Sequence, residues 1–388
     1  GREFKGTDRD RDDLYAATPP LEAVKTLLIL AASQKITDGK KGGAKRTLKK
    51  LSFIDIKKVY FHARVKRPLY VVLPPEALDP GETGVCGKLN FSLYGTRDAA
   101  HNWEEAYTEF LISIGFAPGK SSPCIFRHAA RDIITVEHGD DFTSLASEND
   151  LKWLSEQFKT KFEIKDKGIL GPDPHDAKEV RLLNRTVAWQ HDGIRLEADQ
   201  RHAEILVKSL GLESAKGLDL PGVKDTSAED ADEASRTPVD AASATLYRAC
   251  AARCNFLSLD RPDIQFAAKE VSRGMSAPTP ADFVKLKRLA RYIKQHPRAV
   301  FIYKHQEPIK HINVYSDTDW AGCIKTRKST QGGIALLGSH CVKSWSSTQA
   351  FISLSSGESE YYGVVKASSV GLGLRSLVMD LGVEADVH

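Results

Sequence analysis

Apolar residues recur at helical spacing in three stretches of the first half of the chain, 18–34, 97–116 and 148–162. This spacing places the apolar side chains on one face of each segment, so all three are predicted to be amphipathic helices. The prolines of TPP suit the first turn of the first helix, and Asn149 or Asp150 is expected to cap the third.

Strand-like stretches alternate with these helices. Residues 51–63 are rich in Ile, Val, Tyr and Phe, which predicts a strand that runs into a turn or helix. Residues 224–240 have the acidic, small-residue composition of a linker, and helices are expected from there to about residue 296. From residue 311 the segments HINVYSD, GGIALLGS and CVKSWSS predict strands, followed by a helix from about Ser356 to Leu381.

Two neighbouring aspartates, Asp140 and Asp141, lie at the tip of a predicted apolar hairpin. Adjacent carboxylates repel each other, and crowding them is costly unless a cation neutralises them. Asp55 lies between two isoleucines of the strand in 51–63 and is a third carboxylate that needs a partner. Three such groups suit a pair of Mg²⁺ ions, which prefer carboxylate, water and phosphate oxygens. Two alternatives remain. Asp140 and Asp141 could lie in an ordinary surface turn, and Asp55 could cap the helix that follows its strand.

Composition narrows the class of protein without fixing its function. The chain has 388 residues, 41% hydrophobic and 27% charged, which predicts a globular protein of two or three domains. The formal charge of +4 is too small to imply nucleic acid by itself. Basic residues do gather in 40–50 and in 284–298, each of which is either a solvated segment or a surface that follows a phosphate backbone.

The chain shows no run of apolar residues long enough for a membrane span, so no membrane contact is expected. It begins GREFKGTDRD without Met, and we expect it to be a piece of a longer protein. Cys250 and Cys254 are spaced for one helix face, but no second Cys or His pair lies nearby. The six scattered cysteines therefore favour buried free thiols in a reducing compartment over a zinc site.

Several segments, in a fixed order, resemble the reverse transcriptase of copia-type LTR retrotransposons. They are the strand with Asp55, then LNFSLYGTRDAAHNWEEAYTEFLISIGF, SSPCIFR, HGDD and FEIKDKGILG. RPDI and RYIK, within 247–294, resemble the connecting region of that family. VYSDTDWAGCIKTRKSTQGG and SWSSTQAFISLSSGESEYYGV resemble the start of its RNase H domain. The likeness covers about positions 11 to 382.

This resemblance implies an α+β fold with the right-hand layout of polymerases, followed by a truncated RNase H-like α/β domain. Fingers and palm are expected in 1–223, an acidic linker in 224–245, a helical thumb or connection in 246–310 and the partial RNase H-like domain in 311–388.

The resemblance also implies a function and its site. Asp55, Asp140 and Asp141 match the catalytic, metal-binding aspartates of the polymerase, which hold two Mg²⁺ ions, or Mn²⁺ in their place. The expected reaction is RNA-directed DNA synthesis, in which a primer 3′-hydroxyl attacks a dNTP. The expected partners are an RNA template, a DNA primer and dNTPs.

Tyr60 falls where related polymerases place an aromatic ring against the ribose 2′-hydroxyl. A core tyrosine on a half-buried strand is the alternative. Lys57 and Lys58 either meet triphosphate oxygens or point to solvent. The resemblance thus implies a nucleotide-binding site that includes Lys57, Lys58 and Tyr60, just beyond Asp55.

In the RNase H-like part, Asp317 and Glu360 match the first two metal carboxylates, with Asp319 and Glu358 as close alternatives. We find no match for the third metal aspartate, so RNase H activity is expected to be absent. The strand in 311–317 is expected to keep an unpaired edge.

Other positions depart from the family pattern. The hairpin reads His138, Gly139 where the family usually has Tyr-Val, and Glu137 stands where an apolar residue is usual. Asp98 stands where the family commonly has Gln, which would put a negative charge near the substrate phosphates. These departures favour an alternative reading, a decayed or co-opted retroelement fragment that binds nucleic acid without catalysis.

Overall fold

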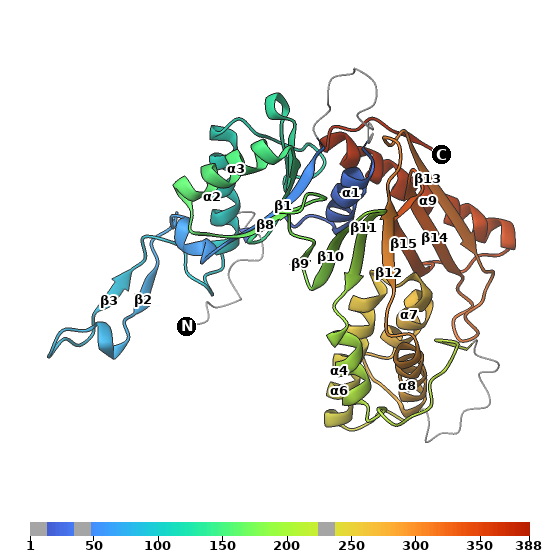
Figure 1. The fold of residues 1–388 in the computed structure, drawn as a ribbon. Helices are drawn as coiled ribbons and strands as arrows, with labels where there is room; N and C mark the ends of the chain where they lie inside the picture. The colour runs from blue at the N-terminus through green and yellow to red at the C-terminus, as the bar shows by residue number, and fades with distance from the viewer. Residues whose placement is uncertain (1–13, 35–47, 224–236) are drawn as a thin grey trace, which may run out of the picture. The chain divides into compact units, whose positions relative to one another are not determined.

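The computed structural model describes residues 14–34, 48–223 and 237–388, which pack into two compact units (Figure 1). The first unit takes its described residues from 1–177 and adds 376–384, and the second takes them from 178–375 and adds 385–388. Most of the basic segment 40–50 and of the linker 224–240 lies outside the described residues. The four domain ranges expected from the sequence stay a prediction.

A six-stranded antiparallel sheet organises the first unit, in the order β4-β5-β6-β7-β1-β8. Its strands are β1 (Lys50–Ile56), β4 (Ala117–Pro118), β5 (Ile125–His128), β6 (Ile133–His138), β7 (Asp141–Ala146) and β8 (Ile164–Leu170). The strand predicted in 51–63 is therefore β1, followed by the 3₁₀ helix η2 (Val59–His62). A separate ribbon pairs β2 (Tyr70–Val72) with β3 (Cys86–Lys88), and η3 (Pro75–Ala77) and η4 (Ala129–Arg131) are single turns.

The three helices predicted in this unit are present as α1 (Leu21–Ala32), α2 (Ala99–Ser113) and α3 (Glu148–Lys161). Helices α2 and α3 bury an aromatic core against the sheet, and α1 lies on the other side of β1 (Figure 1). The expected cap of α3 is wrong, because Ser147 precedes the helix and its hydroxyl accepts the backbone N–H of Asp150. Serine is a preferred N-cap residue because its short side chain reaches that free donor.

The second unit begins with an antiparallel sheet ordered β12-β11-β10-β9. Its strands are β9 (Glu179–Leu182), β10 (Arg185–Gln190), β11 (Gly193–Ala198) and β12 (Val300–Lys304). The predicted helical region is present as α6 (Ala241–Ser258), η5 (Pro262–Ile264), α7 (Gln265–Arg273) and α8 (Pro280–Gln295), which share one core with α4 (Arg201–Ser209). Cys250 and Cys254 are buried free thiols in that core.

A second sheet of this unit has the order β15-β14-β13-β16. Its strands are β13 (His311–Thr318), β14 (Thr330–Leu337), β15 (His340–Thr348) and β16 (Asp386–Val387), and α9 (Ser356–Asp380) runs along it. Gly363 and Gly371 let α9 approach the sheet, since a Cβ would lie within 2.6 Å of a side-chain atom of Thr318 in β13 at the first position and of Val387 in β16 at the second.

The expectation of an unpaired edge at β13 is wrong for its first half. Strand β16 pairs in parallel with His311 and Ile312, and the N–H of Val314 donates to the carbonyl of His388. The short segment after α9 therefore supplies the missing partner. Among the described residues, no helix is both long and apolar enough to cross a membrane.

Candidate active site

The hairpin that carries the two aspartates is held at its turn by a tryptophan. Strands β6 and β7 end their pairing at His138 and Asp141, so Gly139 and Asp140 form the connection. Gly139 has a φ of 74°, a left-handed conformation that glycine adopts without a steric penalty. The indole N–H of Trp103 in α2 donates to the carbonyl of Gly139 over 2.7 Å. The turn is therefore anchored to the aromatic core.

The structure brings the three predicted carboxylates together. Asp55 and Asp141 are opposite each other in the antiparallel register of β1 and β7. The N–H of Ile56 donates to the carbonyl of Asp140 over 2.9 Å, which ties the turn to the end of β1. Directly opposed residues in such a pair have Cβ atoms about 5 Å apart. Asp55 and Asp141 are half-buried, and Asp140 is exposed.

The electrostatics of this group favour a cation. Although the residue as a whole is exposed, neighbouring atoms partly desolvate the carboxyl of Asp140 and raise its pKa, and the negative charges of Asp141 and Asp55 raise the pKa further. A lysine already lies there, because Lys167 Nζ is 2.5 Å from Asp141 Oδ1 and 3.7 Å from Asp55 Oδ1. Sequence reasoning missed Lys167. The available signal was a second lysine two positions after Lys165 in KDKGIL, directly before a glycine.

Glu137 does not join the carboxylates. Its side chain is on the opposite side of β6 from His138 by strand alternation, and it is only 2% exposed. The hydroxyl of Tyr107 donates to Glu137 Oε2 over 2.9 Å. Burial raises the pKa of Glu137 to about 7, although the hydrogen bonds from Tyr107, Gly139 and Cys124 oppose that shift. Glu137 is thus a buried acid beneath the hairpin.

This buried acid should make stability fall as pH rises. The folded pKa of Glu137 is about 7 and the ordinary value is 4.5, so the folded chain binds the proton more tightly between these values. The free energy of unfolding should therefore drop by about 3 kcal/mol from pH 4.5 to pH 8 through this one group. In Glu137→Gln that part of the drop should vanish, as measured by urea unfolding at both pH values. The exposed Glu109→Gln is the control, and an identical pH profile in parent and Glu137→Gln would contradict the assignment.

Tyr60 lines a cavity of about 320 Å³ beside the carboxylates. Its ring packs on Tyr94 with centroids 4.7 Å apart, and the cavity also reaches Trp103, His138 and Asp140. Burial raises the pKa of Tyr60, with smaller contributions from Tyr94 and Asp140. The ring is thus a partly buried wall of a cavity next to Asp140.

Lys57 and Lys58 do not line that cavity. Both are exposed, and Lys57 Nζ pairs with Glu163 Oε1 over 2.9 Å. Lys58 has a φ of 54° and precedes the helix η2.

Asp98 does not present a free negative charge, because its carboxylate is buried and pairs with Arg67 Nε over 3.1 Å. Arg67 therefore neutralises the charge that we expected to lie near substrate phosphates.

The predicted carboxylates of the RNase H-like part lie on or directly after β13 and on α9. Asp317 is exposed on β13, and Glu360 of α9 accepts the N–H of the next residue, Thr318, over 3.3 Å. Asp319 accepts the N–H of Thr330 over 2.6 Å and so closes a loop. Glu358 accepts the N–H of Leu354 over 2.7 Å at the start of α9. Asp319, Glu358 and Glu360 thus each accept a backbone N–H, and Glu360 lies on α9 beside the strand that carries Asp317.

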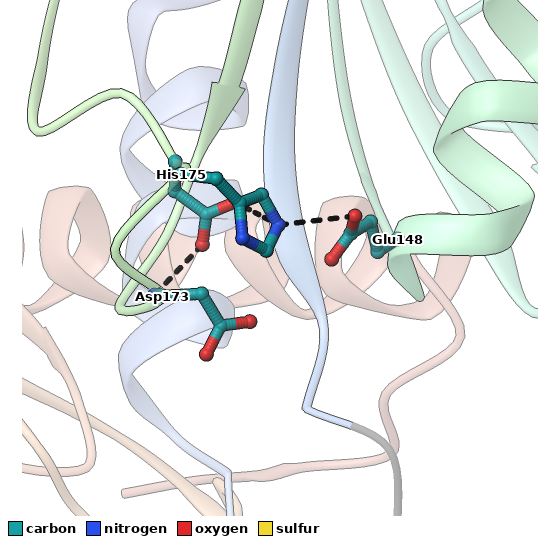
Figure 2. A group of neighbouring side chains, drawn as sticks. Glu148, Asp173 and His175 are labelled. Atoms are coloured by element: carbon teal, nitrogen blue, oxygen red, sulfur yellow. Dashed lines mark hydrogen bonds and ion pairs between the residues drawn. The ribbon is translucent and has the colours of Figure 1, made fainter.

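A second acidic group lies at the other end of β1 and was not predicted. Glu148, Asp173, His175 and Asp176 have ligand atoms within 4.8 Å of one another, and Figure 2 shows Glu148 and His175 pointing toward each other. This donor set could bind a metal ion. However, Lys50 Nζ lies 2.7 Å from Glu148, 2.6 Å from Asp173 and 2.8 Å from Asp176. The lysine side chain is only 4% exposed, and its ammonium group already contacts all three carboxylates and offsets part of their negative charge.

Residues 6–221 match the family model described as reverse transcriptase (RNA-dependent DNA polymerase), which is more than half of the chain. The chain belongs to the reverse transcriptase family. Its mixed helix and strand content is consistent with a domain of that family, and members of the family normally use a divalent metal ion.

Similar proteins place it more closely. The chain is 23% identical over 388 residues to the retrovirus-related Pol polyprotein from transposon TNT 1-94 of Nicotiana tabacum, covering 96% of this chain and 27% of that protein. It is 27% identical over 338 residues to the Pol polyprotein from transposon RE1 of Arabidopsis thaliana, covering 85% and 22%. An uncharacterized mitochondrial protein of Arabidopsis thaliana is 31% identical over 226 residues, covering 57% and 86%. The resemblance to retrotransposon Pol polyproteins is confirmed, and the chain spans about a quarter of the length of the two polyproteins.

Proposed function

We propose that this chain is an RNA-directed DNA polymerase that extends a DNA primer on an RNA template. The observation that carries the proposal is the meeting of Asp55 and Asp141 in register, with Asp140 beside them in the hairpin turn. All three lie within the residues that match the family. In this proposal the six-stranded sheet is the palm, and the helices of 246–310 are the thumb or connection.

The residues present fit a divalent metal site. Carboxylate oxygens are the ligands that Mg²⁺ prefers, and Lys167 shows that a cation is accommodated between Asp141 and Asp55. Asp55, Asp140 and Asp141 would hold two Mg²⁺ ions, or Mn²⁺. Such ions lower the pKa of the attacking hydroxyl and stabilise charge on the phosphate oxygens. The chain itself contributes the rigid placement of these carboxylates, through the β1–β7 register and the contact of Trp103 with the turn.

The cavity beside Asp140 is the proposed site for the sugar of the incoming nucleotide. Tyr60 and Tyr94, whose rings pack on each other, line this cavity together with His138. In this proposal the ring of Tyr60 excludes a 2′-hydroxyl by contact. Lys57 and Lys58, being exposed just before η2, are proposed to approach the triphosphate when it binds.

Tyr60→Ala should relax the discrimination between dNTPs and rNTPs. Removing the ring opens space next to the sugar, so rNTP incorporation should rise at least about tenfold relative to dNTP incorporation. The measurement is single-nucleotide primer extension with each substrate. Phe61→Ala is the matched control, since Phe61 is a neighbouring aromatic residue outside the cavity lining. If the ratio of rNTP to dNTP incorporation is unchanged in Tyr60→Ala, Tyr60 contributes to packing only.

The proposal is tested by primer extension with the whole chain, a DNA primer on an RNA template, dNTPs and Mg²⁺. Template-directed extension is expected, and its loss on chelation of the metal should be complete. A chain that binds the primed template yet adds no nucleotide in Mg²⁺ or Mn²⁺ would overturn catalysis and support the alternative, a fragment that binds nucleic acid without catalysis. Lys167 is the observation that favours this alternative, because its ammonium group competes for the carboxylates.

Asp317 and Glu360 are proposed as part of an RNase H site. They supply two carboxylates from adjacent elements, β13 and α9. Two-metal hydrolysis needs more ligands than these two provide. The expectation that this chain does not cleave the RNA strand of a hybrid remains a prediction.

A further inference from the structure

The positively charged group at the proposed metal site is a side chain of the protein, the ammonium group of Lys167. Lys167 Nζ contacts Asp141 at 2.5 Å and Asp55 at 3.7 Å. The three side chains are between 15% and 29% exposed, so water and salt screen this group less than they screen a surface ion pair. An ammonium group is a compact point charge and can take the place of a metal ion between two carboxylates.

The position of Lys167 is set by an irregularity in β8. Asp166 pairs with Ile54 of β1 and Ile169 pairs with Ser52, so Lys167 and Gly168 together oppose the single residue Phe53. Two residues facing one is a β-bulge, which bends the strand and redirects a side chain. Gly168 takes a φ of 91° there, a left-handed conformation that glycine adopts without a steric penalty.

Hydrogen bonds hold the bulge in this form. Asp166 Oδ1 accepts the N–H of Gly168 over 2.8 Å, and Asp166 Oδ2 accepts the hydroxyl of Ser155 in α3 over 2.6 Å. The bulge is thus fixed both within β8 and from the adjacent helix. Lys167 therefore reaches the carboxylates from a defined backbone position rather than from a freely moving loop.

We propose that Lys167 is a built-in competitor of the divalent metal ions. Its ammonium group pairs with Asp141 and lies near Asp55 in the metal-free protein, and it has to leave before a metal ion binds to them. This inference rests on the proposed metal site. By mass action, a competing cation within the chain lowers the apparent metal affinity without changing the ligands themselves. Lys167 thereby sets the divalent metal concentration at which the polymerase becomes active.

Lys167→Met tests the proposal, because methionine keeps an unbranched stem and removes the charge. The probe is Mn²⁺ alone, with binding to the whole chain followed by the electron paramagnetic resonance signal of the free ion. We expect Lys167→Met to bind Mn²⁺ about tenfold more tightly than the parent. The same high Mn²⁺ concentration should also raise the melting temperature of Lys167→Met more than that of the parent, since stabilisation by a bound ligand grows with the logarithm of its affinity.

Lys165→Met is the matched control. Lys165 lies two residues earlier on β8, in register with Asp55, and is exposed. This change removes the same charge from the same strand, so a general electrostatic effect would appear equally in both variants. Adding Asp141→Asn to the parent and to Lys167→Met shows which part of the binding belongs to this site, as opposed to the cluster around Lys50.

Three outcomes are decisive. If Lys167→Met binds Mn²⁺ more tightly than the parent in a way that depends on Asp141, and Lys165→Met does not, the proposal that Lys167 competes with the metal ion is supported. Equal, Asp141-dependent affinities in the parent and both variants overturn the role of Lys167 and leave the metal site standing. Binding that does not depend on Asp141 in any background overturns the proposed metal site and the competitor with it. Lys167→Gln, with a polar side chain of smaller size, repeats the measurement if Lys167→Met does not fold.

Discussion

Asp140→Asn is expected to abolish primer extension while leaving the fold intact. The asparagine side chain has almost the same shape as aspartate but carries no charge, so it should hold a divalent metal ion poorly. We expect the extension rate to fall by at least about a hundredfold, as for other losses of charge stabilisation at a reacting phosphate. The measurement is extension of a primed RNA template under single-turnover conditions.

The stability of this variant separates a functional role from a structural one. Partial desolvation and the charges of Asp141 and Asp55 raise the pKa of Asp140, so its negative charge is unfavourable in the metal-free protein. Removing that charge should leave the free energy of unfolding unchanged or slightly higher. Glu156→Gln, at an exposed position of α3, is the control for a lost carboxylate. If Asp140→Asn extends the primer as fast as the parent, the activity belongs to other residues.

The main elements of the first unit were predictable because their patterns are local. Helical spacing of apolar residues located α2 and α3, and the apolar run around Gly139 located the hairpin. The meeting of Asp55 with Asp141 was predicted from their strand settings and from the family resemblance. Antiparallel pairing of β1 with β7 then fixes this contact, although 85 positions separate Asp55 from Asp140.

The electrostatic partners of the site were not predictable in the same way. Lys167 reaches Asp141 through a β-bulge, and a bulge changes the side-chain alternation on which strand patterns depend. Arg67 and Asp98 are brought together by a loop, and their pairing has no periodic signal. Glu137 stands where the family usually has an apolar residue, and its carboxylate accepts a hydrogen bond from the hydroxyl of Tyr107. Charges at such positions depend on tertiary contacts rather than on the sequence around them.

The contacts of Lys50 were also not predictable from the sequence around it, and they are expected to contribute strongly to stability. In the sequence it is the last cation of a basic segment, whereas in the structure it is a buried residue at the start of β1. Burial alone would lower its pKa, but hydrogen bonds to Asp173, Asp176 and Glu148 outweigh burial and hold the pKa above its ordinary value. Lys50 thereby connects β1 to the start of α3 and to the loop after β8.

Lys50→Met should therefore destabilise the first unit by about 3–5 kcal/mol, the usual cost of removing one partner of a buried ion pair. The variant removes the ammonium group that contacts Glu148, Asp173 and Asp176 together, and leaves Lys152 on Glu148 alone. Lys49→Met is the matched control, because Lys49 makes a more exposed pair with Asp132 over 2.7 Å and should contribute at most about 1 kcal/mol. Urea unfolding followed by tryptophan fluorescence measures both variants, and equal midpoints for them would contradict the assignment.

The pH dependence of this difference gives an independent check. Hydrogen bonds from Lys152 and then Lys50 lower the pKa of Glu148 to about 2, and the bond to Lys50 lowers the pKa of Asp173. Carboxylates with depressed pKa values stabilise the folded parent above their unfolded values, and this stability is lost as the pH falls toward about 2. In Lys50→Met the same carboxylates repel one another and are protonated more readily, so acid relieves the strain. The gap in stability between parent and variant should thus narrow from pH 7 to pH 4. A gap that stays constant on acidification would show that Lys50 contributes through packing of its hydrocarbon stem instead of through its charge.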